Sequence, residues 1–266
     1  YRYVMEGVWF WENYPMDRGE AAAWNVISNY VRRGRMDIAC GCAGNHTHLF
    51  GPEELRRSAL TKRRLLEKWG VGTRTMIMAD NPGISWSVVQ PYAEAGVENV
   101  LFLPNQWNPL LSTIWPQNKK IPYANWNPDA GGGGNRIDVR WDSPLPMLFW
   151  WQAPDGVSKL LFWAGTQYTF GGLAFGVNNR KQKPSVKKME EKLPRQLAKM
   201  DARYPYDVWL FANYSDDEKP STWVSDLFKR WNAKWRWPEF RTIGNPDEAF
   251  EAVKAKWGEQ IPVLSG

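Results

Sequence analysis

The sequence predicts an α/β fold in which parallel strands alternate with helical crossovers, as in a barrel or an open doubly wound sheet. Apolar runs of strand length alternate with amphipathic stretches of helical spacing almost throughout the chain. The length of 266 residues suits one α/β barrel, and 43% hydrophobic residues suffice for a buried core. No tandem repeat of about 20–50 residues is visible, and no Gly-rich nucleotide-binding motif follows a predicted strand.

Turn residues and helix signals set the boundaries in the first half of the chain. Gly34 and Gly70 are suited to end helices, and Pro52 suits the first turn of one. The run Asp80-Asn81-Pro82-Gly83 ends an apolar strand-like segment. The expected helices are residues 17–33, 52–69 and 86–95, and the expected strands are residues 36–40, 74–79 and 99–103.

The second half begins with a break in this alternation. Residues 104–146 carry Pro, Asn, Trp and a run of glycines, which indicates a long functional or mobile loop. Pro154-Asp155-Gly156 lies between two apolar runs and predicts a hairpin. The expected strands of this half are residues 145–151, 158–164, 207–211, 239–243 and 261–264, and the expected helices are residues 185–203, 221–235 and 246–257.

Charge and cysteine content restrict the possible partners. The chain carries 34 Lys and Arg against 28 Asp and Glu, a net charge of +6. Basic residues gather in 56–64 and 180–192 without a nucleic-acid motif, which favours solvated helix faces over a nucleic-acid surface. No apolar run reaches the roughly 20 residues of a membrane span. Cys40 and Cys42 are expected to be free thiols, which slightly favours the cytoplasm and leaves secretion open.

The aromatic content favours a carbohydrate ligand. The chain holds 18 tryptophans and is 15% aromatic. Part of this must be core, but several clusters lie close to turn residues. Flat aromatic faces pack well against the C–H faces of sugar rings. We expect Trp151 and Tyr168 to be among the residues that contact a sugar.

Acidic residues follow two of the expected strands, at the positions where barrels carry their catalytic groups. Asp80 follows the strand at 74–79, either as a turn former or as a carboxylate held for nucleophilic attack or metal binding. Asp216 and Asp217 follow the strand at 207–211, either as a solvated loop or as a carboxyl pair in which one pKa is raised. Glycosidic cleavage needs such an acid opposite an ionised carboxylate.

The two histidines of the chain lie two residues apart, in the loop after the strand at 36–40. Through this spacing His46 and His48 can ligate a metal or hydrogen-bond sugar hydroxyls. No third ligand at matching spacing is obvious. We therefore expect these histidines to bind substrate rather than to hold a metal.

Taken in order, these segments resemble glycoside hydrolase family 38, the α-mannosidase-like family. Residues 34–48 and the helix that ends at Gly70 look like the run that leads into that family's nucleophile strand. Met78-Ala79-Asp80-Asn81-Pro82-Gly83 resembles its Asp-Pro-Phe-Gly segment with an Asn inserted, and residues 92–97 resemble the helix and turn that follow. Asp216-Asp217 is similar to its Asp-Asp-Phe segment, with Glu218 in place of the Phe.

The resemblance implies a (β/α)7-type barrel, incomplete at both ends, with residues 1–266 as a single partial domain. It implies that Asp80 is both nucleophile and metal ligand and that Asp217 is the acid/base, with Asp216 beside it in the substrate site. In that family one divalent metal, usually zinc, touches the substrate hydroxyls. The family's His-x-Asp pair and its remaining His ligand would lie outside this sequence, so we expect a fragment of a longer enzyme.

The function expected from the sequence is a retaining glycosidase that acts on α-mannoside-like linkages with a divalent metal. A metal-dependent polysaccharide deacetylase, with His46 and His48 as ligands, is one alternative. A non-catalytic carbohydrate-binding domain, which the tryptophans suit, is a second, and a nucleic-acid binder, supported only by charge, is a third. We expect a carbohydrate partner and neither a nucleic-acid nor a membrane partner. The sugar, the linkage and the oligomeric state stay open.

Overall fold

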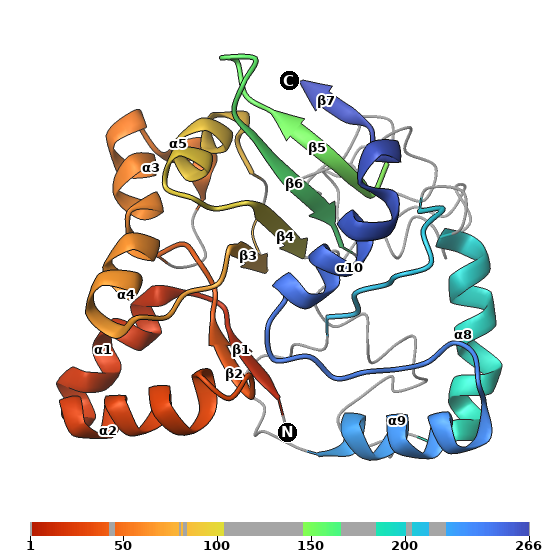
Figure 1. Ribbon diagram of the computed structural model, residues 1–266. Helices are drawn as coiled ribbons and strands as arrows, with labels where there is room; N and C mark the ends of the chain where they lie inside the picture. The colour runs from red at the N-terminus through yellow and green to blue at the C-terminus, as the bar shows by residue number, and fades with distance from the viewer. Residues whose placement is uncertain are drawn as a thin grey trace, which may run out of the picture.

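Five of the described strands form one sheet, and two more form a parallel pair (Figure 1). The computed structural model describes residues 2–42, 46–79, 81, 84–103, 146–165, 185–200, 204–212 and 222–265. The sheet order is β3-β4-β6-β5-β7, and the pair is β1 with β2. The strands are β1 (Tyr3–Met5), β2 (Met36–Ile38), β3 (Thr75–Ala79), β4 (Asn99–Leu103), β5 (Leu148–Gln152), β6 (Lys159–Ala164) and β7 (Val263–Ser265).

The strand pair continues the sheet at the β3 edge. Beyond β2, Cys40 forms a parallel bridge to Met76, and its N–H donates to the Thr75 carbonyl at 2.9 Å. β1 runs parallel to β2, β3 to β4, and β4 to β6. The carboxyl ends of these five strands therefore lie along one edge, as the alternation of helices and strands predicted.

The hairpin expected around Pro154-Asp155-Gly156 is confirmed, and it adds one antiparallel pair to the otherwise parallel sheet. β5 pairs antiparallel to β6, because residues 153–158 are too few for the crossover that parallel strands need. β7 pairs in parallel with β5 at the far edge. In the part of the chain that the structure describes, β7 and β1 do not pair. The described sheet is thus open, and closure into a seven-stranded barrel is not seen in it.

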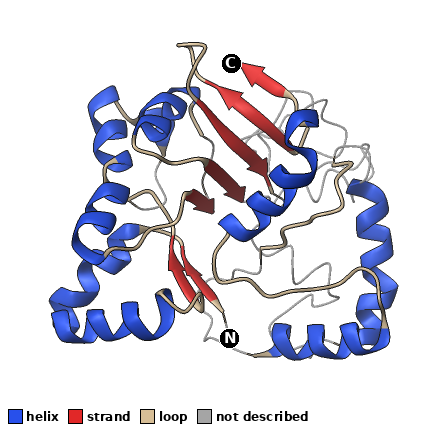
Figure 2. Ribbon diagram, in the orientation of Figure 1, coloured by secondary structure: helices blue, strands red, loops and turns tan. Residues whose placement is uncertain are grey.

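Helices cover both faces of the sheet (Figure 2). Side chains of α3 and α5 enter the core on one face, and those of α8, α9 and α10 enter it on the other. The α-helices are α1 (Val8–Arg18), α2 (Glu20–Val26), α3 (Pro52–Ala59), α4 (Thr61–Trp69), α5 (Val89–Glu94), α8 (Val186–Met200), α9 (Trp223–Lys234) and α10 (Asp247–Trp257). Shorter helical segments are η1 (Ile27–Val31), η2 (Thr47–Leu49), η3 (Trp86–Val88) and η5 (Gly258–Gln260).

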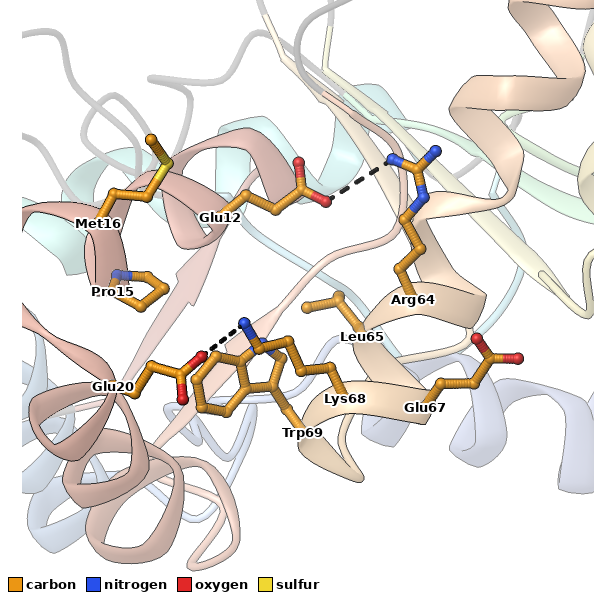
Figure 3. Close-up of a pocket in the computed structure, with 9 residues that line it drawn as sticks. All are labelled: Glu12, Pro15, Met16, Glu20, Arg64, Leu65, Glu67, Lys68 and Trp69. Carbon is orange, nitrogen blue, oxygen red and sulfur yellow. Dashed lines mark ion pairs between the residues drawn. The ribbon is translucent and has the colours of Figure 1, made fainter.

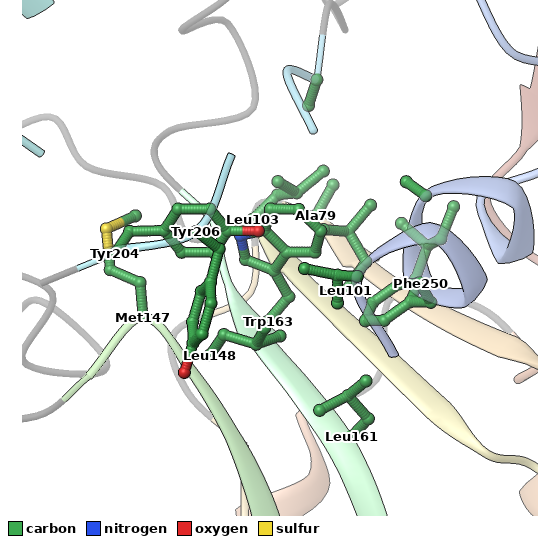
Figure 4. Packing of buried hydrophobic residues seen from close by; sticks show 14 of the residues in the cluster. Ala79, Leu101, Leu103, Met147, Leu148, Leu161, Trp163, Tyr204, Tyr206 and Phe250 are labelled. Atoms are coloured by element: carbon green, nitrogen blue, oxygen red, sulfur yellow. The ribbon is translucent and has the colours of Figure 1, made fainter. Parts of the chain in front are cut away.

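Alternate residues of the strands enter two hydrophobic layers. Leu101 and Trp163 lie in the layer shared with α8, α9 and α10. There Trp163 stacks on Tyr204 at a ring-centroid distance of 5.0 Å and meets Phe250 edge-on at 5.6 Å (Figure 4). Phe102, the neighbour of Leu101 on β4, lies in the opposite layer with residues of α3 and α5. Burial on both faces explains why β3 and β4 read as continuous apolar runs.

Two expected strands are wrong. Residues 207–211, which are rich in apolar side chains, and residues 239–243, which include Phe240 and Ile243, form no strand. The Asn232 amide donates to the Phe240 carbonyl at 2.7 Å, and the Phe240 N–H donates back to Asn232 Oδ1 at 3.0 Å. A side chain thus satisfies the backbone groups that a neighbouring strand would otherwise pair. The apolar side chains of both segments are only partly buried, and apolar content alone does not make a segment a strand.

Most of the expected helices are confirmed within a few residues. Gly70 ends α4 with a left-handed φ of +63°, as the helix-stop signal predicted. The helix expected over residues 17–33 begins later, because Gly19 separates α1 from α2 with a φ of +84°. The helix α1 itself was not predicted. Among the residues that the structure describes, no helix is long and apolar enough to cross a membrane.

Candidate active site at the carboxyl ends of the strands

Most of the predicted catalytic and binding residues lie outside the described part of the chain. The residues outside it are Asp80, Tyr168, Asp216 and Asp217. Of these, Asp80 directly follows Ala79, the last residue of β3. The side chain of His48 also lies outside it. The predicted approach of Asp80 to Asp217 therefore stays a prediction. The described residues nonetheless show what surrounds the end of β3.

Glu6 reaches the end of β3 from the neighbouring strand pair. It follows β1 directly, and its carboxylate accepts the Ala79 N–H at 3.0 Å. Glu6 was not among the site residues predicted from the sequence. The signal was present, because Glu6 is an acidic residue placed directly after an apolar segment, as Asp80 is. The first strand is only three residues long, which made that signal weak.

The histidine loop packs against the segment that follows Asp80. Thr47, 1% exposed, accepts the Ser85 N–H on its Oγ1 at 2.8 Å. His46 is exposed and precedes η2, where its carbonyl accepts the Leu49 N–H at 2.9 Å. The loop after β2 and the loop after β3 are therefore joined. Whether the ring of His46 faces a substrate stays a prediction.

Asn81 places an unsatisfied amide next to Asp80. Its side chain is 3% exposed, and Nδ2 has no hydrogen-bond partner within the described ranges. A buried donor left unpaired costs about 1–3 kcal/mol, so such groups in native proteins call for an explanation. A ligand oxygen would satisfy this donor. From sequence, Asn81 counted as a turn residue only, because burial cannot be read from the Asp-Asn-Pro-Gly pattern.

Trp151 is not brought to this edge of the sheet. It pairs with Leu160 near the start of β6, and its ring meets Phe162 edge-on at 5.1 Å. Only 6% of Trp151 is exposed. Because β5 runs antiparallel to β6, its last residues lie beside the amino end of β6. The structure therefore does not gather Trp151 with Glu6 and Asn81.

The described residues do not assemble a metal site by themselves. No group of three or more His, Cys, Asp or Glu residues with suitable spacing occurs among them. The Cys40 thiol donates to the Thr73 carbonyl at 2.7 Å, and burial raises its pKa. Burial also raises the pKa of Cys42. Both groups therefore stay thiols near neutral pH, whereas metal binding needs the thiolate.

A shallow cavity of about 670 Å³ lies elsewhere, between α1, the start of α2 and α4 (Figure 3). Two ion pairs cross it, Lys68 with Glu20 at 2.9 Å and Arg64 with Glu12 at 4.0 Å. None of the residues named at the carboxyl edge lines this cavity. Its charged groups are already paired, which indicates helix packing rather than catalysis.

Basic residues of α3 and α4 lie on solvated helix faces. Arg57 pairs with Glu53 at 2.8 Å and Arg63 with Glu67 at 2.7 Å, each one helical turn apart. All four side chains are largely exposed. This is the arrangement that was favoured over a nucleic-acid surface for residues 56–64.

Comparison with known proteins gives a family over the whole sequence. The Glycosyl hydrolases family 38 N-terminal domain matches residues 1–266. A solved α-mannosidase from Enterococcus faecalis V583 superimposes with a TM-score of 0.63 at 16% identity, over 99% of this chain and 25% of that one. A second Enterococcus faecalis protein, described as belonging to glycosyl hydrolase family 38, gives a TM-score of 0.57 at 15% identity, over 99% and 23%. No curated protein sequence matches.

At these identities the two structural matches establish a shared fold. The chain spans about a quarter of the length of each solved protein. The likeness also agrees with the mixed α/β architecture and the sheet rich in parallel pairs.

Proposed function

The chain belongs to glycosyl hydrolase family 38, and we propose that it supplies part of the catalytic domain of a retaining α-mannosidase-like glycosidase. The observation that carries this proposal is the family match over residues 1–266. The position of Asp80 agrees with it, because Asp80 follows a fully buried parallel strand at the edge where Glu6, Thr47 and Asn81 also lie. We propose further that the seven strands belong to one partial β/α barrel domain.

The proposed chemistry uses two carboxyl groups in turn. Asp80 attacks the anomeric carbon and displaces the leaving oxygen, which Asp217 protonates. Asp217 then takes a proton from water, which attacks the same carbon and releases Asp80. Two inversions at one carbon give net retention. As the sequence predicts, repulsion between the neighbouring carboxylates of Asp216 and Asp217 would raise one of the two pKa values, which would keep a proton available near neutral pH.

Polar groups at the carboxyl edge of the sheet are proposed to bind the substrate. His46, His48 and Asp216 are proposed to contact sugar hydroxyls, and the unpaired Nδ2 of Asn81 is suited to donate to a sugar oxygen. Tyr168 is proposed to shape the sugar site, as predicted. Trp151, predicted for the same part, lies beside the amino end of β6, so a sugar contact by Trp151 would fall outside the edge where Glu6 and Asn81 lie.

A divalent metal, zinc by resemblance, would be bound by Asp80 together with ligands from outside this sequence. Bound there, it would orient the sugar hydroxyls and share negative charge with Asp80. The steps assigned to Asp80 and Asp217 do not depend on it. The deacetylase-like and non-catalytic alternatives gain no support from the family match.

The stereochemistry of hydrolysis tests the proposed function. The intact protein is incubated with an aryl α-mannoside, and proton NMR follows the first anomer of mannose that forms. We expect α-mannose before mutarotation, with the aryl β-mannoside as a matched control that is not cleaved. First appearance of β-mannose would exclude a retaining mechanism. Absence of cleavage, with deacetylation of an acetylated polysaccharide instead, would favour the alternative enzyme.

A further inference from the structure

The last peptide of β3 is held by a side chain rather than by a strand. The Ala79 N–H lies four residues after Thr75, so both point to the same edge of β3. At that edge Thr75 accepts the Cys40 N–H, which identifies it as the edge facing β2. By regular continuation, a backbone carbonyl after Cys40 would accept the Ala79 N–H. Glu6 accepts it instead, at 3.0 Å.

The chain after Cys40 is turned away from β3 by its contacts with α1. The Gly41 carbonyl accepts the Val8 N–H at 3.0 Å, and the Cys42 carbonyl accepts the Trp9 N–H at 2.8 Å. Gly41 allows this turn with a φ of +101°. Of these two, the Cys42 carbonyl is the one that would have extended the ladder along β3, because alternate residues of a strand face the same neighbour. Since it bonds to the first turn of α1, the Ala79 N–H at the end of β3 is bonded by Glu6 instead.

Glu6 is itself fixed from both sides. The residue before it, Met5, accepts the Ala39 N–H at 2.9 Å, and α1 begins two residues after it, at Val8. Its backbone therefore has little freedom, and its side chain approaches Ala79 from a defined direction. The end of β1 and the end of β3, which are far apart in sequence, are thus joined at the Ala79 peptide that precedes Asp80.

We propose that Glu6 is a positioning residue for the nucleophile, an inference that rests on the proposed role of Asp80. Its carboxylate fixes the Ala79 peptide and thereby the direction in which the chain leaves β3 toward Asp80. The contact to the Ala79 N–H uses an acceptor oxygen at the right reach, which a neutral amide side chain of the same length can also supply. Glu6 itself neither attacks the sugar nor transfers a proton.

The experiment compares two conservative variants of the intact protein. Glu6→Gln keeps the reach and a carbonyl oxygen that accepts the Ala79 N–H, but it removes the charge. Glu6→Asp keeps the charge but shortens the side chain by one methylene, about 1.5 Å. Glu12→Gln on α1 is the matched control, because its carboxylate lies 4.0 Å from Arg64 and away from β3. Aryl α-mannoside hydrolysis gives kcat and KM for each, and thermal melting confirms folding.

If Glu6 is a positioning residue, Glu6→Gln should keep kcat within about threefold of the parent value. Glu6→Asp should lower kcat about 10–100-fold, which is the effect expected when a reacting group is misplaced by about 1 Å. KM should change by less than about threefold in both, since binding contacts are untouched. The pre-steady-state release of the aryl alcohol should slow for Glu6→Asp by at least the factor seen in kcat, because attack by Asp80 is the step affected.

Two results would overturn the inference. If Glu6→Gln is as slow as Glu6→Asp, or slower, the charge itself is needed and Glu6 acts directly on substrate or metal. If both variants match Glu12→Gln in kcat, Glu6 has no part in catalysis. Either outcome leaves the proposed function intact so long as the parent cleaves the mannoside and Asp80→Asn does not. A parent without mannosidase activity would instead remove the function on which the inference rests.

Discussion

The two ends of β3 and β4 use polar side chains in different ways. At the amino ends, the Asp247 carboxylate accepts the hydroxyls of Thr73 and Thr75 at 2.7 and 2.5 Å and the Arg74 N–H at 2.9 Å. Asn99 adds a bond to Thr75 Oγ1 at 3.1 Å. At the carboxyl ends, Glu6 accepts the Ala79 N–H, and Nδ2 of Asn81 has no hydrogen-bond partner within the described ranges.

This difference between the two ends suggests that the amino ends of the strands contribute to stability and the carboxyl ends to the proposed function. Asp247 begins α10 and is 8% exposed, so its bonds lock a helix start to the strand starts inside the core. In α/β proteins, ligands bind outside the carboxyl ends of the strands. Substitutions at the carboxyl ends should therefore lower activity, and substitutions at the amino ends should lower stability.

Asp80→Asn should give the largest effect. Loss of the nucleophile and of one metal bond should lower kcat for aryl α-mannosides by about 10³-fold or more, while sugar binding persists. Steady-state kinetics and titration with mannose measure the two properties separately. Near-parent turnover in this variant would remove Asp80 from the mechanism.

Asp217→Asn should depend on the leaving group. Without the proton donor, hydrolysis of unactivated mannosides should fall by about 10²–10⁴-fold, whereas activated aryl mannosides should keep a fast first step and accumulate glycosyl-enzyme. The measurement is the rate ratio for the two substrate classes, with Asp216→Asn as the matched control. If Asp216→Asn alone shows the leaving-group dependence, the acid within the pair is Asp216.

At the opposite end, Asp247→Asn should lower stability and leave activity unchanged. The amide retains one acceptor oxygen where the carboxylate served three donors, so we expect a loss of about 2–4 kcal/mol in unfolding free energy. Denaturant unfolding measures this, and kcat of the folded fraction should match the parent. Glu251→Gln, a partly exposed partner of Arg74, is the control with little effect.

Asp37→Asn should have a smaller effect of the opposite sign. Burial raises the pKa of Asp37 from an ordinary value of 3.8 to about 7. Between these values the folded chain holds a proton that the unfolded chain has lost, so this group destabilises the fold as the pH rises through that window. The variant should gain about 1–2 kcal/mol at pH 8, little at pH 4, and a flatter pH dependence of unfolding. A loss of stability at pH 8 would contradict the raised pKa.

Much of the fold followed from local signals that do not need distant partners. Gly70 stops α4 because it adopts a left-handed conformation. Asp155 forms the predicted hairpin turn by accepting the N–H groups of Val157 and Ser158. The expected strand at 239–243 failed because its pairing depends on Asn232, whose part in the fold is set by tertiary contact.

The candidate site could be predicted from the sequence only where a motif existed, and its predicted catalytic residues stay a prediction. Asp80 stands in a segment that resembles a known family, so it could be named before the structure. Glu6 belongs to no motif, and its importance depends on the departure of residues 41–42 from the edge of β3. Asn81 was visible as a turn residue, but its burial and its unpaired donor arise from packing around it.

The location of the covalent glycosyl bond tests the central claim most directly. The intact protein is incubated with a fluorinated, activated α-mannoside that slows the second step, then digested and analysed by mass spectrometry. We predict one mannosyl adduct, on Asp80, within the peptide that follows Thr75–Ala79. An adduct on Asp216, Asp217 or Glu6 would contradict the assignment of the nucleophile to the end of β3.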